Sequence, residues 1–123
     1  MTFPTINFKT TNTDLEPTLT DLAERKYTSL EKFWSEDAQV FCEVEFDKVT
    51  SRNGGPIHRV EVNLTVNGKL YRAEATMESF EEAIDEVRDE LEQELRRSKE
   101  KQDTLVRKGG RKLKERMLGR ATA

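Results

Sequence analysis

The sequence VEVNLTVNGKLYRAEATMESFEEAIDEVRDELEQELRRSKEK, residues Val60–Lys101, decides the fold. Its first part alternates apolar and polar residues, which is the pattern of a β-strand that buries one face. Asn67 and Gly68 interrupt the alternation, and this pair strongly indicates a tight hairpin because both turn residues must reach positive φ. The pattern therefore predicts one strand over residues 57–66 and a second over residues 69–77.

The second half of this stretch changes its apolar period from two residues to about 3.6, which is typical of an amphipathic helix. Ser79 and Glu82 have the spacing of a capping box at the start of that helix. We expect the helix to run to about Lys101, which makes it roughly 34 Å long. A nine-residue strand spans only about 30 Å, so the helix should overhang the sheet at its C-terminal end. Its apolar stripe comprises Phe80, Ala83, Ile84, Val87, Leu91 and Leu95.

Three further elements are predicted upstream. Residues 5–9 read as a short first strand, and residues 39–47 alternate as a second strand with one buried face. Between them, Pro17 suits the first position of a helix that we expect to end near Trp34. The apolar face of this helix comprises Leu19, Leu22, Ala23, Tyr27, Leu30 and Trp34. The order is βαβββα, an α+β fold with a four-stranded sheet and both helices packed on its one apolar face.

Charge divides the chain in two. The whole chain has 123 residues and a net charge of −3, which suits one domain with a modest core. Residues 1–101 hold 14 basic and 22 acidic residues, whereas residues 102–123 hold seven and two. We therefore expect a βαβββα domain over residues 1–102, followed by a basic, flexible tail over residues 103–123 that contains a Gly-Gly pair.

The sequence lacks the residues that several classes of protein need for their function. There is no apolar run long enough to span a membrane and no secretory signal pattern at the start. Cys42 is the only cysteine and falls at an inward strand position, which suits a buried thiol in a reducing cytoplasm. His58 is the only histidine, and we expect a strand-end residue with a satisfied ring nitrogen. We predict no enzyme, no metal or other cofactor, and no small-molecule substrate.

Two stretches resemble a known family. Leu30-Glu31-Lys32-Phe33 near the end of the first helix is one match, and Val60–Lys101 is the longer one. The order of these pieces is similar to the ribosome hibernation promoting factor and ribosome-associated inhibitor family. The recurrent pieces of that family are a strand, an Asn-Gly or Gly-Gly hairpin, an Arg-Ala-Glu-Ala strand, an Ala-Ile-Asp helix start and a Leu-Glu-x-x-Leu-Arg-Lys helix end. Its members are also called ribosomal subunit interface proteins, and the resemblance covers about residues 3–101. The tail lacks strand-like alternation, so we expect a short form without the family's C-terminal ribosome-pairing domain.

The resemblance implies a cytoplasmic translation inhibitor, monomeric when free. It would bind rRNA of the small ribosomal subunit, in the decoding channel used by mRNA and by A- and P-site tRNA. Glu90 and Gln93 stand where family members often have basic residues, so the tail is expected to supply compensating contacts. Tyr27 is expected in the core, whereas Phe41 is expected on an exposed surface that can contact bases. The candidate rRNA-binding residues are Arg25, Lys26, Lys32, Arg88, Arg96, Arg97, Lys99 and Lys101 on the helices, with Arg107, Lys108, Arg111 and Lys112 in the tail.

Two other functions stay open on the sequence. A double-stranded RNA-binding domain has a similar order of elements, but it places lysines at the start of its last helix, where this chain has Ser79-Phe80-Glu81-Glu82. A protein-interaction domain that uses the acidic helix faces and binds no RNA would suit the acidic body. Sedimentation with ribosomes separates the three hypotheses.

Overall fold

The computed structural model describes residues 5–51 and 53–118, with side chains described through residue 102. Four strands and two α-helices follow one another in the order βαβββα, with a short 3-10 helix after the first α-helix. The elements are β1 (Ile6–Thr11), α1 (Pro17–Thr28), the 3-10 helix η1 (Ser29–Phe33), β2 (Val40–Lys48), β3 (His58–Val66), β4 (Lys69–Met77) and α2 (Phe80–Leu118).

The four strands form one mixed sheet in the order β1-β2-β3-β4. β1 pairs with β2 in parallel, and the other two pairs are antiparallel. A parallel pair needs a crossover connection, which α1 provides, whereas the short Asn-Gly turn suffices for the antiparallel β3–β4 pair. The register places Cys42 opposite both Ile6 and Leu64, so the apolar residues of neighbouring strands share one face.

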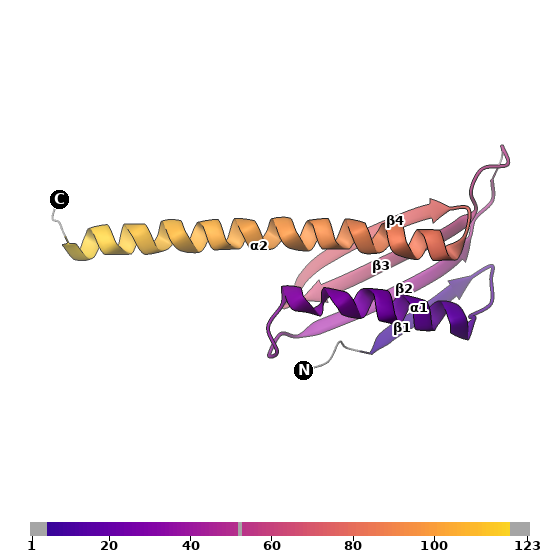
Figure 1. Ribbon diagram of the computed structural model, residues 1–123, viewed down its shortest axis with the longest axis horizontal. Coiled ribbons are helices and arrows are strands. Elements are labelled where there is room, and N and C mark those ends of the chain that lie inside the picture. Colours follow the sequence, from indigo (N-terminus) through magenta and orange to yellow (C-terminus); the bar gives the residue numbers. More distant parts are fainter. Residues whose placement is uncertain (1–4, 52, 119–123) are drawn as a thin grey trace.

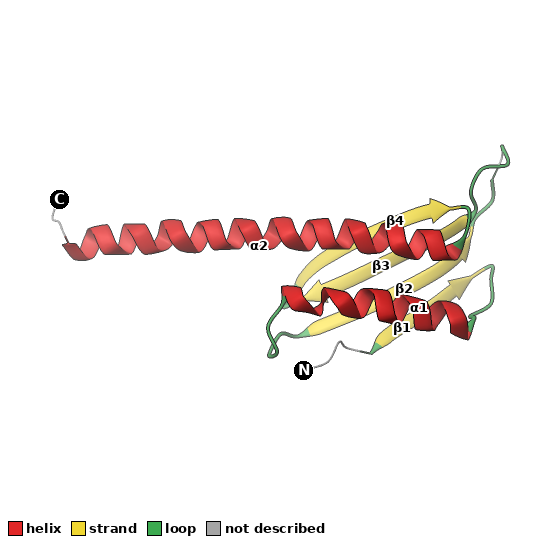
Figure 2. Cartoon of the chain, in the orientation of Figure 1, coloured by secondary structure: helices red, strands yellow, loops and turns green. Residues whose placement is uncertain are grey.

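Both helices cover that apolar face and leave the other face of the sheet open, as Figures 1 and 2 show. The core between the layers contains the alternate residues of β2 and β3 and the stripes of both helices. Tyr27 is fully buried there and its hydroxyl donates a hydrogen bond to the backbone oxygen of Ile84 at 3.2 Å, which ties α1 to α2. The predicted α+β fold, with two helices on one face of a four-stranded sheet, is confirmed.

Short sequence motifs explain the turn that precedes β4 and the start of the helix that follows it. Asn67 and Gly68 have φ values of 49° and 83°, as the predicted hairpin turn requires. At the start of α2, the backbone N–H of Glu82 donates to the Ser79 hydroxyl at 3.2 Å, which satisfies one of the unpaired donors of the first turn. The Ser79 hydroxyl in turn donates to the Glu82 carboxylate at 3.4 Å, so that carboxylate accepts from the hydroxyl and not from the backbone N–H of Ser79. The expected cap is therefore present with one of its two usual bonds.

The first helix differs from its prediction. Instead of continuing to Trp34, the α-helix ends at Thr28 and tightens into the 3-10 helix η1. The hydroxyl of Thr28 donates to the carbonyl of Glu24, and the hydroxyl of Ser29 donates to the carbonyl of Lys26. Such side-chain bonds compete with the regular helical ladder and favour a change of helix type where they occur in succession.

The second helix is longer than expected. Its predicted end near Lys101 is wrong, because the helical backbone continues to Leu118 through Gly109 and Gly110. Figure 1 shows that this part of α2 extends well past the sheet, so the expected overhang is confirmed and is larger than the sequence indicated. The division into a domain of residues 1–102 and a basic segment of residues 103–123 stays a prediction.

The two residues considered for chemistry are both structural. Cys42 is buried, and burial raises the pKa of its thiol to about 12, so little thiolate forms at neutral pH. His58 stacks edge-on against Phe80 with ring centroids 4.8 Å apart. The expectation of a satisfied ring nitrogen is wrong for Nδ1, which is buried and has no hydrogen-bond partner among the described residues.

Candidate nucleic-acid interface

A cluster of three cations lies around Glu92 where α2 passes η1. Arg88 and Arg96 reach its carboxylate at 3.0 and 3.2 Å, one helical turn to either side, and Lys32 approaches from η1 at 3.9 Å. The hydrogen bond from Arg96 is the largest cause that lowers the pKa of Glu92, followed by the charges of Arg88 and Arg96. The carboxylate of Asp89 also lies 3.6 Å from Arg88. Two carboxylates do not neutralise three cations, so the cluster has a net positive charge.

Arg88 is the fixed member of this cluster. Its Nε and one terminal nitrogen both donate to the Ser29 hydroxyl, at 3.1 and 3.0 Å, in addition to its contact with Glu92. Lys32 and Arg96 are exposed instead, and both lie over the ring of Phe33, at 5.4 and 5.7 Å from its centroid. These two side chains can exchange Glu92 for a phosphate at small cost, because exposed ion pairs contribute little to stability.

The remaining residues expected on the first helix lie apart from this cluster. Lys26 forms an exposed ion pair with Asp85 of α2 at 3.0 Å, further towards the start of that helix. Arg25 lines a shallow hollow with Asp21, Glu24 and Thr28 on α1. The structure therefore brings together Lys32, Arg88 and Arg96, whereas the hollow that Arg25 lines is formed by residues of α1.

Arg97 lies on the other flank of α2, which faces β4. It pairs with Glu94 at 2.8 Å and lines a hollow of about 520 Å³ that also contains Lys101 and Arg72. Glu90 and Gln93, the two positions that depart from the family pattern, line the same hollow. Partial burial raises the pKa of Glu90, and the nearby charges of Glu86 and Glu74 raise it further. Both departures therefore lie on the β4 flank, away from the cluster around Glu92.

The open face of the sheet is acidic. Arg59, near the start of β3, contacts the carboxylates of Glu61 and Glu74, with Glu45 and Asp47 each at 3.9 Å. Burial alone would raise the pKa of Glu61, but its hydrogen bonds from Arg59 and Asn63 outweigh that effect and lower it. Phe41 is 66% exposed, as expected, on this same sheet face. Because carboxylates surround Arg59, this face repels phosphate, and the helix side is the better candidate for RNA.

The sequence did not predict a contact between the start of β4 and the middle of α2. The hairpin brings Lys69 and Tyr71 beside Ser98, whose hydroxyl oxygen accepts hydrogen bonds from both, at 2.9 and 2.7 Å. Lys99 and Lys101 line the same pocket. The Asn-Gly turn locates Lys69 at a hairpin end, but no sequence signal shows that this end meets α2.

The tail residues Arg107, Lys108, Arg111 and Lys112 follow on the same helical backbone, but their side chains lie outside the described residues. Among the side chains that the structure describes, no group of three His, Cys, Asp or Glu residues could hold a metal ion. Within the same described part, no helix has the length and apolar character needed to cross a membrane.

Comparison with known proteins decides the family. The family model described as "Sigma 54 modulation protein / S30EA ribosomal protein" matches residues 6–103, which covers the sheet, α1, the part of α2 up to residue 103 and the cluster around Glu92. This chain belongs to the S30EA family. The match begins at the first residue of β1 and ends just after the last residue whose side chain is described.

Two solved structures resemble this S30EA family member. The Protein Y N-terminal domain of Thermus thermophilus matches with a TM-score of 0.63 at 24% identity, over 75% of this chain and 96% of that one. A ribosomal subunit interface protein from Coxiella burnetii matches with a TM-score of 0.60 at 21% identity, over 76% and 96% of the two chains. At these identities the likeness shows a shared fold. No curated protein sequence gives a significant match.

Proposed function

We propose that this chain is a cytoplasmic hibernation factor that binds rRNA in the decoding channel of the small ribosomal subunit and blocks translation. It acts as a binding protein and not as an enzyme, and it is a monomer when free. The observation that carries the proposal is the family match over residues 6–103, whose description names a ribosomal protein. The shared fold with a ribosomal subunit interface protein supports it.

The helix side of the molecule is the proposed contact surface. The cluster of Lys32, Arg88 and Arg96 presents a net positive charge to solvent, and Arg88 is held in place by Ser29. Phosphate contacts of this kind position a protein on RNA without reading its sequence. The full proposed set comprises Arg25, Lys26, Lys32, Arg88, Arg96, Arg97, Lys99 and Lys101, continued along α2 by Arg107, Lys108, Arg111 and Lys112.

Occupation of the channel would block translation by exclusion. A protein that lies where mRNA and tRNA bind needs no reaction, because its affinity alone keeps the substrates of decoding out. The overhanging part of α2 lengthens the surface that can follow an rRNA groove beyond the sheet. The acidic open face of the sheet would then point away from the rRNA.

A competition experiment tests this proposal. Small ribosomal subunits are incubated with labelled tRNA and mRNA, and the full-length protein is added at increasing concentration. The proposal expects tRNA to be released as the protein binds, and expects cell-free translation to fall over the same concentration range. Binding to the subunit with full retention of tRNA and mRNA would contradict the decoding-channel assignment, and no binding to ribosomes would contradict the function.

A further inference from the structure

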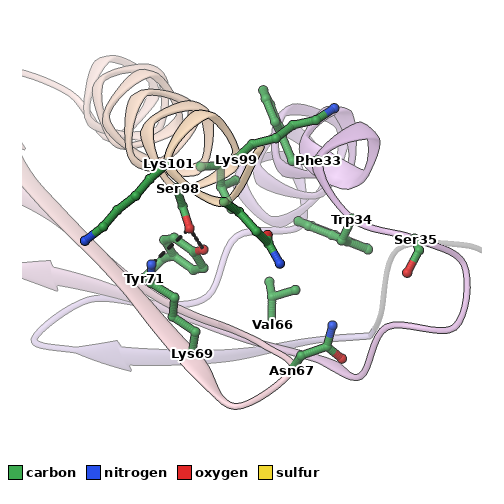
Figure 3. A pocket seen from close by; sticks show the side chains of 12 residues that line it. Phe33, Trp34, Ser35, Val66, Asn67, Lys69, Tyr71, Ser98, Lys99 and Lys101 are labelled. Atoms are coloured by element: carbon green, nitrogen blue, oxygen red, sulfur yellow. Dashed lines mark hydrogen bonds between the residues drawn. The ribbon is translucent and has the colours of Figure 1, made fainter. Parts of the chain in front are cut away.

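A pocket of about 600 Å³ lies where the end of η1, the β3–β4 hairpin and the later part of α2 meet (Figure 3). Its volume falls within the range of roughly 300–1,000 Å³ that is common for ligand sites. Trp34 and Tyr71 lie on opposite sides of the pocket, with Val66 between them. All three are only partly buried, because one side of each packs on the core and the other faces the pocket.

The charge of the pocket is as distinctive as its aromatic walls. Lys69, Lys99 and Lys101 line it, and among the described residues that line it none is acidic. The body of the chain is otherwise acidic, with 22 acidic and 14 basic residues over residues 1–101. The Lys69 ammonium group lies beside the Tyr71 ring, whereas the side chains of Lys99 and Lys101 extend away from the two aromatic rings in Figure 3. The lining of the pocket therefore carries a local excess of positive charge on an acidic body.

On one wall of the pocket, hydrogen bonds hold the polar side chains in place before any ligand binds. The Ser98 hydroxyl oxygen accepts hydrogen bonds from Lys69 at 2.9 Å and from Tyr71 at 2.7 Å. The ammonium group of Lys69 also lies 5.2 Å from the centroid of the Tyr71 ring. These contacts fix a cation directly beside an aromatic surface, so little side-chain entropy is lost when a ligand binds there.

We propose that this pocket binds a nucleotide. The base stacks against the aromatic walls, where each base–aromatic contact contributes about 1–3 kcal/mol in other proteins. The phosphate lies beside the ammonium group of Lys69, which Ser98 and Tyr71 hold in place. A simple anion would make no use of the aromatic walls, and an apolar ligand would make no use of the lysines. The nucleotide is either an unpaired residue of an RNA strand, in which case the inference rests on the proposed function, or a free mononucleotide.

The chain contains its own reporter for this site. Trp34 is the only tryptophan, so a base stacked in the pocket quenches the whole indole fluorescence of the protein. We expect saturable quenching of the full-length protein when adenosine monophosphate or a six-residue oligoadenylate is added without ribosomes. Equal affinity for the two probes would identify a free-nucleotide site, and markedly tighter binding of the oligonucleotide would identify an RNA site.

A matched pair of charge reversals completes the test. Lys69→Glu should weaken the binding of the quenching probe on the order of tenfold or more, because it places a carboxylate beside the phosphate. Lys48→Glu makes the same charge change at the end of β2 that lies farthest from the Asn-Gly hairpin. This control should leave the affinity for the probe unchanged. No saturable quenching by either probe, or equal weakening in the two variants, would overturn the nucleotide site. Because no ribosome is present, that result would leave the competition experiment above unaffected.

Discussion

Leu91 lies in the middle of the apolar face of α2 and is fully buried between that helix and the sheet. Leu91→Ala removes packing atoms and leaves a cavity that the surrounding layers fill only in part. We expect the free energy of unfolding to fall by about 2–5 kcal/mol. Denaturant titration followed by circular dichroism measures this change. An unfolding midpoint equal to that of the wild type would show that α2 does not pack on the sheet as described.

The surroundings of Glu90 in the folded protein disfavour the ionised form of its carboxyl group. Burial raises its pKa, as do Glu86 and Glu74, so the folded protein binds a proton at Glu90 more readily than the unfolded chain does. A raised carboxyl pKa means that stability falls as pH rises from the ordinary value of about 4.5 through the folded value.

Glu90→Gln removes that penalty. At pH 7 the variant should be as stable as the wild type or more stable, by no more than about 0.5 kcal/mol because the side chain is largely solvated. The advantage should disappear below the ordinary carboxyl pKa, where both proteins are neutral at this position. Thermal melts at pH 7 and pH 4 measure the difference, and a variant that is less stable than the wild type at pH 7 would contradict the assignment.

At the scale of elements, periodicity predicts which segments form strands and helices but not where helices end. The apolar faces of β2 and β3 follow from alternation alone, and the Asn-Gly turn fixes the β3–β4 register. The tightening of the first helix at Ser29 depends on two hydroxyl bonds to backbone carbonyls, which composition does not specify. The extension of α2 passes two glycines, residues that propensity places near helix ends.

Those glycines provide a test of the extension. Gly costs about 1 kcal/mol relative to Ala within a helix. If the backbone is helical to Leu118, the double variant Gly109→Ala and Gly110→Ala should hold this segment more firmly. The helical signal at 222 nm should then decrease less on mild heating than it does in the wild type. Identical heating curves would indicate that α2 ends before Gly109.

At the scale of the molecule, the sequence names candidate residues, but which of them lie together depends on the fold. The cluster around Glu92 joins Lys32 to Arg88 and Arg96 across two elements, and sequence spacing does not give that distance. Arg96 and Arg97 are adjacent in sequence, yet helical geometry sends them to opposite flanks of α2. The pocket at Lys69 was missed for the same reason, because it forms only when the hairpin packs beside α2.

The basic segment after residue 103 makes a separate prediction about the whole molecule. If its seven cations contact rRNA, binding should depend steeply on salt, with each neutralised phosphate of a single-stranded segment contributing about −0.7 to the log–log slope. Deletion of residues 104–123 should weaken ribosome binding and flatten the slope by on the order of two to four units, for three to six contacts. Ribosome affinity is measured against salt for both proteins. Parallel lines of equal affinity would show that this segment takes no part in binding.

The most direct test of the account is co-sedimentation with small ribosomal subunits on sucrose gradients. Three proteins are compared: the wild type; a variant with Arg96→Gln, Arg97→Gln and Lys99→Gln; and a control with Lys9→Glu and Lys48→Gln, which lowers the net charge equally on the sheet. All three replaced residues of the first variant are exposed, so folding should be unaffected. We predict that wild type and control migrate with the subunit and that the affinity of the α2 variant falls by about tenfold or more. Failure of the wild type to co-migrate, or equal binding by all three proteins, would contradict the claim that α2 holds this chain on the ribosome.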